Sequence, residues 1–427
     1  MINLIEELKW RGLIQDIMPG TAEQLQKELT KGYVGFDPTS DSLHIGSLVP
    51  IILLMHLQKA NHQPYALVGG ATGLVGDPSG KSEERNMLPV ETIRRNAEGI
   101  EKQLRKFLHF DTSKPNHAIL VNNYDWFEGM TFLDFIRDVG KHITVNYMLS
   151  KDSVQKRLET GMSFTEFTYQ LVQGYDFYYM YEKFGVKLQF GGSDQWGNIV
   201  TGTELIRRKS NGEGFAFTAP LLKKADGGKF GKTESGNIWL DASKTSPYQF
   251  YQFWLNVSDA DVENYIKVFT FIAPEEIDDL IKVHKENPNL RTLQKRLAQE
   301  LTVLVHSEDD YEFAKRASSF LFSEQAMDEI RNLSQAQFLN IMHGIPLHEI
   351  SKLSIENGID IVTLLAESGI MPSKGEARKM VQQGGIAINK NKINAIDAII
   401  TNTNVMHEKY IMVQRGKKND YLIEVVS

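Results

Sequence analysis

The sequence lacks cysteine altogether. Disulfide bonds and cysteine-based zinc sites are therefore excluded, and a reducing, cytoplasmic location is favoured. Long apolar runs are also missing: the longest, from Leu48 to Met55, is far shorter than the roughly 20 residues of a membrane-spanning helix. The first 12 residues contain two acids and no apolar core of a signal peptide, so we expect a short amphipathic helix there and no leader.

A large excess of one charge is absent as well. Hydrophobic residues make up 41% and charged residues 24% of the 427 residues, which is typical of a globular protein with two or three domains. The net charge of −7 argues against general attraction to nucleic acid. The residues from Asp360 to Ser427, however, carry nine basic and seven acidic side chains, a net +2, which leaves −9 on the rest of the chain. We therefore expect any polyanion to be met by this C-terminal segment.

Short apolar runs that end in turn residues alternate with helical patterns in the first half of the chain. The runs that read as strands are 33–37, 65–70, 118–123 and 186–192. Helical patterns lie between them, at 48–60 and 90–108. This alternation predicts an α/β fold with a mostly parallel, Rossmann-like sheet, whose ligands bind at the carboxyl ends of the strands.

The pattern changes twice further along the chain. We expect the Rossmann-like domain to cover 1–245 and an α-helical domain to cover 246–345. A linker over 346–359 then leads to a small α+β domain over 360–427, where two short helices precede several strands.

Two glycine-containing segments follow predicted strands and suit anionic ligands. After the first strand, Thr39, His44 and Gly46 lie at the start of a helix, where backbone N–H groups can bind phosphate. After the second strand, residues 69–85 resemble a P-loop, but position 75 is valine where that motif needs glycine, so we reject it. A glycine-rich loop remains, and its candidate site residues are Asp77, Lys81 and Arg85.

Three further clusters carry polar side chains. The spacing of Tyr169, Gln173 and Asp176 places them on one helical face, where they could hold an ammonium group and a phenol. Asp194 and Gln195 follow the strand at 186–192 and suit ribose hydroxyls or a carboxylate. Lysines at 229 and 232 lie in a glycine-rich stretch that can fold over a polyphosphate. Each cluster alone also fits a structural role, but together they form ATP-compatible elements at successive strand ends.

Several of these segments resemble class I aminoacyl-tRNA synthetases. HIGS at 44–47 is similar to their HIGH signature, and KFGKT at 229–233 is similar to their KMSKS loop. Tyr33, Asp77, the face at 169–176 and GGSDQWGN at 191–198 resemble the tyrosine-specific branch in its bacterial form. Residues 368–389 resemble an S4 RNA-binding module. Ser47 departs from the second histidine of HIGH, and Gly231 and Thr233 replace the two serines of KMSKS.

The resemblance implies activation of L-tyrosine with ATP to tyrosyl-adenylate and pyrophosphate, followed by transfer to the terminal ribose of tRNA(Tyr). Tyrosine would be bound by Tyr33, Asp77, Tyr169, Gln173, Asp176 and Gln195. ATP would be bound by Gly35, Asp37, Gly46, Ser47, Asp194 and Lys232. Catalytic roles would fall to Thr39, His44, Lys229, Lys232, Thr233, Lys81 and Arg85. RNA would be bound by Lys374, Arg378, Lys379, Lys390 and Lys392.

The same resemblance implies magnesium that arrives with ATP, no dedicated protein metal site, a homodimer and no membrane association. The apolar, aromatic stretch at 126–149 could be the dimer interface or part of the core. Three alternatives stay open: a tryptophan-specific relative, a pantothenate–β-alanine ligase on the same fold, and an RNA-binding protein on an inactive synthetase fold.

Overall fold

The chain forms two compact units, and the computed structural model describes most of it. The described residues are 3–79, 87–158, 161–228, 230–233, 236–320, 330–343, 345–416 and 419–427. The first unit comprises residues 1–244 and 254–305, and the second comprises 245–253 and 306–427. None of the helices in the described ranges is long and apolar enough to cross a membrane.

A six-stranded sheet with the order β1-β6-β5-β2-β3-β4 forms the centre of the first unit. Its strands are β1 (Asp16–Ile17), β2 (Lys31–Phe36), β3 (Gln63–Val68), β4 (Ile119–Asn122), β5 (Leu188–Gly192) and β6 (Phe215–Ala219). All neighbouring strands run parallel except β1, which pairs antiparallel with β6. The predicted α/β class with a mostly parallel sheet is confirmed. The strands β1 and β6, which form one side of the sheet next to β5, were not predicted.

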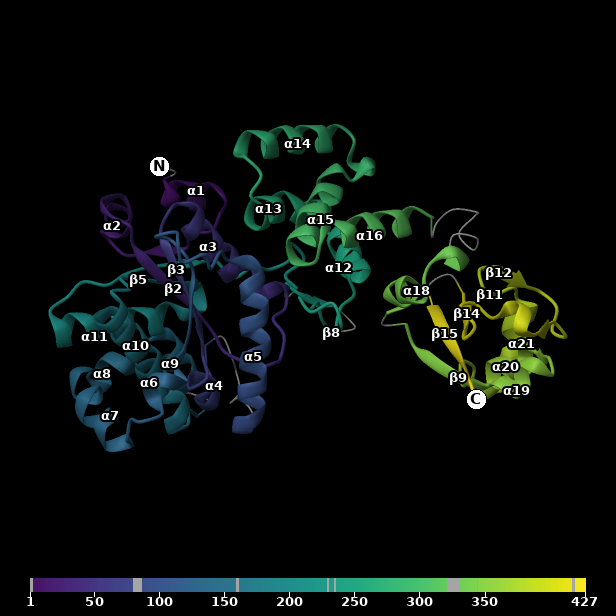
Figure 1. Ribbon diagram of the computed structural model, residues 1–427, viewed down its shortest axis with the longest axis horizontal. Coiled ribbons are helices and arrows are strands. Elements are labelled where there is room, and N and C mark those ends of the chain that lie inside the picture. Colours follow the sequence, from purple (N-terminus) through teal and green to yellow (C-terminus); the bar gives the residue numbers. More distant parts are fainter. Residues whose placement is uncertain are drawn as a thin grey trace. The chain divides into compact units, whose positions relative to one another are not determined.

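Helices cover both faces of this sheet (Figure 1). The helices α3 (Leu48–Lys59) and α5 (Val90–Phe107) lie on one face, and α10 (Phe164–Phe184) and α11 (Trp196–Ser210) lie on the other. This arrangement follows from right-handed crossovers, because the strand order runs in opposite directions on the two sides of the β5–β2 pair. The carboxyl ends of β5 and β2 therefore diverge, and such a switch point is where ligands bind in open α/β sheets.

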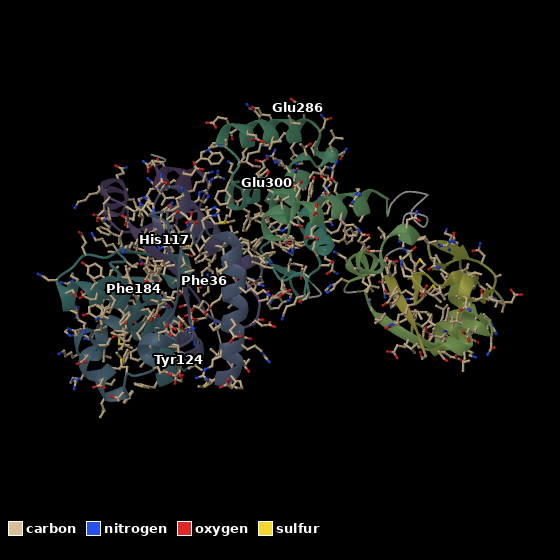
Figure 2. The ribbon with its side chains drawn as sticks, viewed as in Figure 1. Phe36, His117, Tyr124, Phe184, Glu286 and Glu300 are labelled. Atoms are coloured by element: carbon tan, nitrogen blue, oxygen red, sulfur yellow. The ribbon has the colours of Figure 1, made fainter. Side chains whose placement is uncertain are left out.

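Shorter helices complete the first unit. Before and between the strands lie α1 (Leu4–Trp10), α2 (Thr21–Lys27), α4 (Thr72–Val75), α6 (Tyr124–Phe127), α7 (Phe132–Asp138), α8 (Val145–Leu149) and α9 (Asp152–Leu158). After the sheet lie α13 (Asp259–Phe269), α14 (Pro274–Glu286) and α15 (Thr292–Val305). Phe36 is buried at the end of β2, whereas Glu286 at the end of α14 points into solvent (Figure 2).

The second unit is built on a five-stranded sheet with the order β12-β11-β14-β15-β9. The strands are β9 (Leu347–Ser351), β11 (Ile386–Ile388), β12 (Asn391–Ile393), β14 (Tyr410–Arg415) and β15 (Asn419–Val426). The strands β10 (Ile359–Asp360) and β13 (Ile399–Ile400) form a separate pair beside this sheet. The helix α12 (Pro247–Leu255) begins in this unit. The other helices of the unit are α16 (Glu308–Phe320), α18 (Gln335–Met342), α19 (Lys352–Glu356), α20 (Ile361–Glu367) and α21 (Lys374–Gln382).

The side chains of β14 point alternately to the two faces of this sheet, and apolar side chains on both faces explain why helices pack on both. Ile411 and Val413 belong to one core cluster with side chains of α20 and α21. Tyr410 and Met412 belong to a second cluster with side chains of α16 and α18. Successive residues of a strand point to opposite faces, so a single strand supplies both cores.

The expected domain division differs from these units in two places. The helical segment 246–345 is shared between them, since α13 to α15 belong to the first unit and α16 and α18 to the second. Part of the expected linker at 346–359 is ordered as β9 and α19, because β9 forms a parallel pair with β15. Which segments fold independently stays a prediction.

Candidate active site

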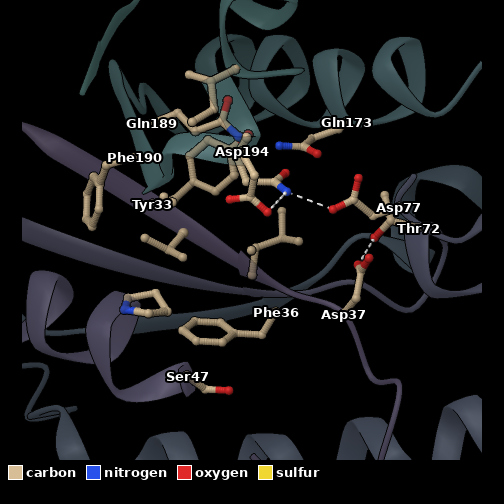
Figure 3. Close-up of a pocket in the computed structure, with 18 of the residues that line it drawn as sticks. Tyr33, Phe36, Asp37, Ser47, Thr72, Asp77, Gln173, Gln189, Phe190 and Asp194 are labelled. Carbon is tan, nitrogen blue, oxygen red and sulfur yellow. Dashed lines mark hydrogen bonds between the residues drawn. The ribbon is translucent and has the colours of Figure 1, made fainter. Parts of the chain in front are cut away.

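A cavity of about 360 Å³ opens at the carboxyl ends of β2 and β5, where the strand order reverses. It unites most of the residues that the sequence analysis singled out. Those that line it are Tyr33, Gly35, Asp37, Thr39, His44, Gly46, Ser47, Asp77, Tyr169, Gln173, Asp176, Asp194 and Gln195. Figure 3 shows side chains from β2, β5 and α10 that converge on the same space.

Asp176 is the most deeply buried carboxylate of this cavity, with an exposed fraction of 2%. It lies on α10, three residues after Gln173 and on the same face. The indole Nε1 of Trp126 donates to its Oδ1 at 2.8 Å, and the amide Nδ2 of Asn123 donates to its Oδ2 at 3.0 Å. Burial raises the pKa of Asp176 to about 8, although both hydrogen bonds favour the charged form.

The hydroxyl of Tyr33 faces the same end of the cavity. Its ring is 1% exposed and packs edge-on against Phe177, with 5.5 Å between the ring centroids. The hydroxyl has no hydrogen-bond partner among the described residues. Burial, and secondarily the negative charge of Asp176, raise the pKa of Tyr33 well above its usual range. A neutral phenol and a carboxyl group therefore lie at one end of the cavity, and a buried orphan hydroxyl there favours a polar ligand.

Gln189 lies beside Tyr33 and was not predicted as a site residue. The two residues are register partners in the parallel β5–β2 pair, and both line the cavity (Figure 3). The Oε1 of Gln189 is buried and has no partner within the described part of the chain. A polar residue in the middle of an otherwise apolar strand is the signal that could have revealed it.

A hydrogen-bond network connects the two ends of the cavity. Asn123 donates to Asp176 and also to the hydroxyl of Thr72, at 3.0 Å in each case. Thr72 in turn donates to Oδ1 of Asp37 at 2.6 Å, and the hydroxyl of Tyr169 donates to Oδ2 of Asp37 at 2.9 Å. Because the Tyr169 proton points toward Asp37, a lone pair of its oxygen remains to accept a hydrogen bond from a ligand.

A second network lies next to the first, where Asp77 is beside Thr72 (Figure 3). The amide Nε2 of Gln195 donates to Oδ2 of Asp77 at 2.7 Å and lies 3.4 Å from Oδ2 of Asp194. Asn198 on α11 donates to Oε1 of Gln173 at 3.1 Å. Burial, and then the nearby charge of Asp77, raise the pKa of Asp194. This part of the cavity is therefore electronegative and suits an ammonium group and hydroxyl donors.

His44 precedes a helical turn (Ile45–Ser47) at the start of α3. The backbone N–H of Gly46 donates to its Nδ1 at 3.0 Å. In the neutral imidazole the proton is therefore on Nε2, which makes Nε2 a donor. Thr39 and Ser47 add hydroxyl groups to the same rim. The rim is therefore rich in hydrogen-bond donors, and phosphate binding by this segment stays a prediction.

The KFGKT segment lies only partly within the described residues. Lys229, Lys81 and Arg85 fall outside them, and Lys232 and Thr233 are described by their backbone alone, as strand β7 paired with β8 (Gly236–Asn237). Phe230 packs among three aromatic rings, with centroid distances of 5.1 to 6.0 Å; they are Trp254, Tyr265 and Phe269. This contact attaches the start of the segment to α13.

The residues predicted to bind RNA lie in the second unit. Lys374, Arg378 and Lys379 are exposed on α21. Lys390 and the preceding Asn389 both have positive φ and form a two-residue turn between β11 and β12, as in a type I′ hairpin. The lysines are thus presented on a helix and at the tip of a hairpin.

Three residues that hold side chains of the cavity in place were not predicted from the sequence. Asn123 and Trp126 follow β4, and Thr72 begins α4. Their contacts with Asp176 and Asp37 span at least 35 residues of sequence. Asn123 comes directly after the carboxyl end of β4, and this position could have indicated it as a site residue.

The raised pKa of Asp176 predicts a pH-dependent effect on stability. The unfolded chain releases this proton near the usual value of 3.8, whereas the folded chain keeps it up to about pH 8. Stability is therefore lost as pH rises through this window, by at most about 1.4 kcal/mol for each pKa unit. Asp176→Asn removes this loss, so the unfolding free energy of the variant minus that of the parent should increase from about pH 5 to about pH 8.5. Urea unfolding between about pH 5 and pH 8.5 measures this difference in unfolding free energy. The control is Asp125→Asn, because Asp125 is exposed. A difference between the Asp176→Asn variant and the parent that stays constant or shrinks with pH contradicts the effect of burial.

Comparisons with known proteins agree with this geometry. The family model "tRNA synthetases class I (W and Y)" matches residues 25–323, and "Tyrosine--tRNA ligase SYY-like C-terminal domain" matches residues 337–423. The tyrosine–tRNA ligase of Bacteroides fragilis is 59% identical to the chain, over 99% of the chain and 99% of its own length. That of Porphyromonas gingivalis is 56% identical, over 99% of the chain and 100% of its own length. The C-terminally truncated mitochondrial tyrosyl-tRNA synthetase of Aspergillus nidulans is 31% identical, with a TM-score of 0.67 over 75% of this chain and 95% of that one. The chain belongs to the class I aminoacyl-tRNA synthetases, and within them to the tyrosine–tRNA ligases.

Proposed function

We propose that this cavity activates L-tyrosine with ATP, and that the chain then transfers the tyrosyl group to tRNA(Tyr). The observation that carries the proposal is the orphan hydroxyl of Tyr33 next to the Asp176 carboxyl group, both buried at one end of the cavity. A substrate phenol would accept a hydrogen bond from Tyr33 and donate one to Asp176. Both protein groups would then have partners.

The same pair gives a physical account of amino-acid choice. Phenylalanine would fill the apolar part of the cavity but leave Tyr33 and Asp176 unpaired, at the cost of their desolvation. A site that is built to hydrogen-bond a hydroxyl rejects the analogue without it strongly, an effect for which tyrosine–tRNA ligases are themselves the standing example. The pair therefore makes a separate editing reaction against phenylalanine unnecessary.

The amino acid's other end would lie in the electronegative part of the cavity. We propose that Asp77, Tyr169 and Gln173 bind its ammonium group. The lone pair of the Tyr169 hydroxyl and the carboxylate of Asp77 both point to a cationic ligand. Gln195 would lie near the substrate carboxylate, and its amide is held in place by Asp77.

ATP would occupy the rim formed by the first strand end and the start of α3. Asp194 would bind the ribose, while Gly35, Asp37, Gly46 and Ser47 would line the nucleotide site. Thr39 and His44 would donate to the phosphate that leaves. Lys229, Lys232, Thr233, Lys81 and Arg85 would neutralise pyrophosphate; this role rests on the sequence alone. Magnesium would arrive with ATP and supply further charge neutralisation; within the described ranges, no group of three or more metal-ligating residues is clustered.

Activation needs no nucleophile or base from the protein, because the tyrosine carboxylate is already an anion. One carboxylate oxygen forms a bond to the α-phosphorus, and the bond from that phosphorus to the bridging oxygen breaks, which releases pyrophosphate. The protein positions the two reactants and stabilises the charge on the leaving group. In the second step, a terminal ribose hydroxyl of tRNA attacks the carbonyl carbon of the adenylate and AMP leaves.

Transfer requires that tRNA be held by surfaces outside the cavity. We propose that Lys374, Arg378, Lys379, Lys390 and Lys392 contact its phosphates. Their placement on α21 and on the β11–β12 hairpin supports this, since exposed basic groups on ordered elements suit a fixed phosphate spacing. The cytoplasmic location predicted from the absence of cysteine remains a proposal.

A homodimer is proposed from an apolar surface on the first unit. Large apolar side chains are exposed on α7, α8 and at the start of α10; they are Phe132, Leu133, Ile136, Val145 and Phe164. A groove of about 360 Å³ lined by Tyr124, Phe127, Phe132 and Phe135 lies in the same region. Exposed apolar surface of this extent is typical of an interface between subunits.

Replacing Tyr33 by phenylalanine tests the proposed phenol contact. Tyr33→Phe should raise the KM for tyrosine in ATP–pyrophosphate exchange by about 3- to 10-fold, the value of one neutral hydrogen bond. It should leave the KM for ATP unchanged, and it should not lower the rate with phenylalanine, because the hydroxyl that phenylalanine leaves unpaired is removed. Tyr65→Phe is a matched control, because Tyr65 is the register partner of Tyr33 on β3 and is buried but does not line the cavity. Equal losses with tyrosine and phenylalanine would sink the proposed contact.

A charge on the apolar surface tests the dimer. The Leu133 side chain is 75% exposed, so Leu133→Asp should not affect folding, but it should shift the chain from dimer to monomer at micromolar concentration. Analytical ultracentrifugation measures the change, and Leu290→Asp, at another exposed apolar site of the same unit, is the control. A parent chain that is monomeric, or a variant that remains dimeric, would show that this surface does not form the interface.

A further inference from the structure

The His44 segment and the KFGKT segment are joined by backbone hydrogen bonds into one small antiparallel strip. The N–H of Ile45 donates to the carbonyl of Ile238 at 3.0 Å, and the N–H of Leu240 donates to the carbonyl of Leu43 at 2.9 Å. The β7–β8 pair extends the strip, since the N–H of Ile238 lies 3.4 Å from the carbonyl of Gly231. The sequence analysis gave no role to residues 236–240.

His44 and Trp239 lie directly opposite each other in this strip. The hydrogen bonds are made by their neighbours, so the two residues form a non-hydrogen-bonded pair, the kind whose side chains approach most closely. Ile238 and Leu240 are buried, which turns Trp239 to the other face, toward His44. The two rings meet edge-on, with 6.2 Å between centroids and 66° between planes.

The imidazole also lies against Gly46. A Cβ atom at this glycine would lie 2.7 Å from Cε1 and 3.0 Å from Nδ1 of His44, closer than atoms can approach. The Gly46 backbone N–H also holds Nδ1. His44 therefore has two neighbours that restrict its ring, a glycine at which a side chain would clash with the imidazole and the ring of Trp239.

Trp239 is itself held in place by a charged pair. The ammonium group of Lys244 lies 5.1 Å from the centroid of the indole, and the same group forms an ion pair with Asp41. The hydrogen bond from Lys244 lowers the pKa of the Asp41 carboxyl group. Asp41 lies three residues before His44, so Lys244 connects both ends of the strip around the tryptophan.

We propose that Trp239 is a positioning residue for His44 in the activation step, a role that rests on the proposed function. Trp239 restricts the imidazole to the rotamer in which Nε2–H is available to the phosphates. Without the indole, the ring has room to turn, and misplacement of a group by about 1 Å can cost up to about 10²-fold in rate. Trp239 is not one of the described residues that line the cavity, so the affinity for tyrosine should be unaffected.

A double-mutant cycle in the full chain tests this role. Trp239→Ala should slow single-turnover adenylate formation by about tenfold or more, with the Kd for tyrosine within about twofold of the parent. Trp239→Phe, which keeps an edge-on ring, should restore most of the rate. In a His44→Ala background, Trp239→Ala should cause no further loss, because the side chain through which it acts is gone. Trp10→Ala is a control for removal of an indole; Trp10 contacts Arg11 and Lys267.

The outcomes separate this inference from the proposed function. If Trp239→Ala slows adenylate formation by the same factor with and without His44, or weakens tyrosine binding equally, the positioning role is overturned. If His44→Ala alone leaves adenylate formation unchanged, the proposed function of His44 fails, whatever Trp239 does. Thermal unfolding of each variant verifies that a lost rate is not a lost fold, and Trp239→Phe provides the same test if the alanine variant does not fold.

Discussion

Burial of the Asp176 carboxyl group is the constraint on which the rest of the cavity depends. A carboxylate that is taken out of water is unfavourable unless donors surround it, and here Trp126 and Asn123 supply two N–H groups. Even so, burial raises the pKa of the group to about 8. A ligand that donates an O–H group to Asp176 supplies what the protein itself does not provide. We infer that the burial of Asp176, which is unfavourable for folding, is what favours a ligand with a hydroxyl group.

The donors of Asp176 also connect the two halves of the cavity. Asn123 shares its amide between Asp176 and Thr72, and Thr72 donates to Asp37, to which Tyr169 donates as well. The Asp176 end and the Tyr169 end of the cavity are therefore held by one continuous network rather than by separate contacts. Because each group is fixed by the next, the cavity can be formed before any substrate binds, as positional catalysis requires.

The sequence predicted the parts of this site that follow from local spacing. The helical face of Tyr169, Gln173 and Asp176 and the strand–helix turn at His44 depend on residues close together in the chain, and the structure places all four around one cavity. The α/β class followed from alternating patterns for the same reason. Substrate roles within the cavity remain predictions.

Contacts between distant segments could not be predicted in this way. Asn123 and Trp126 reach Asp176 across 50 or more residues, and Gln189 meets Tyr33 only because β5 and β2 are neighbours in the sheet. The strands β1 and β6, the pairing of β9 and the contact between His44 and Trp239 depend equally on tertiary pairing. A single sequence carries no direct signal for such partners.

The most direct test of this account is ATP–pyrophosphate exchange without tRNA, measured against all twenty amino acids. The account predicts exchange with tyrosine, and little with phenylalanine or tryptophan, because only tyrosine gives both Tyr33 and Asp176 a partner. Comparable exchange with phenylalanine would contradict the phenol pair as the basis of selectivity. Exchange with tryptophan instead of tyrosine would contradict the proposed substrate, and folded protein that exchanges with no amino acid would contradict the activation chemistry itself.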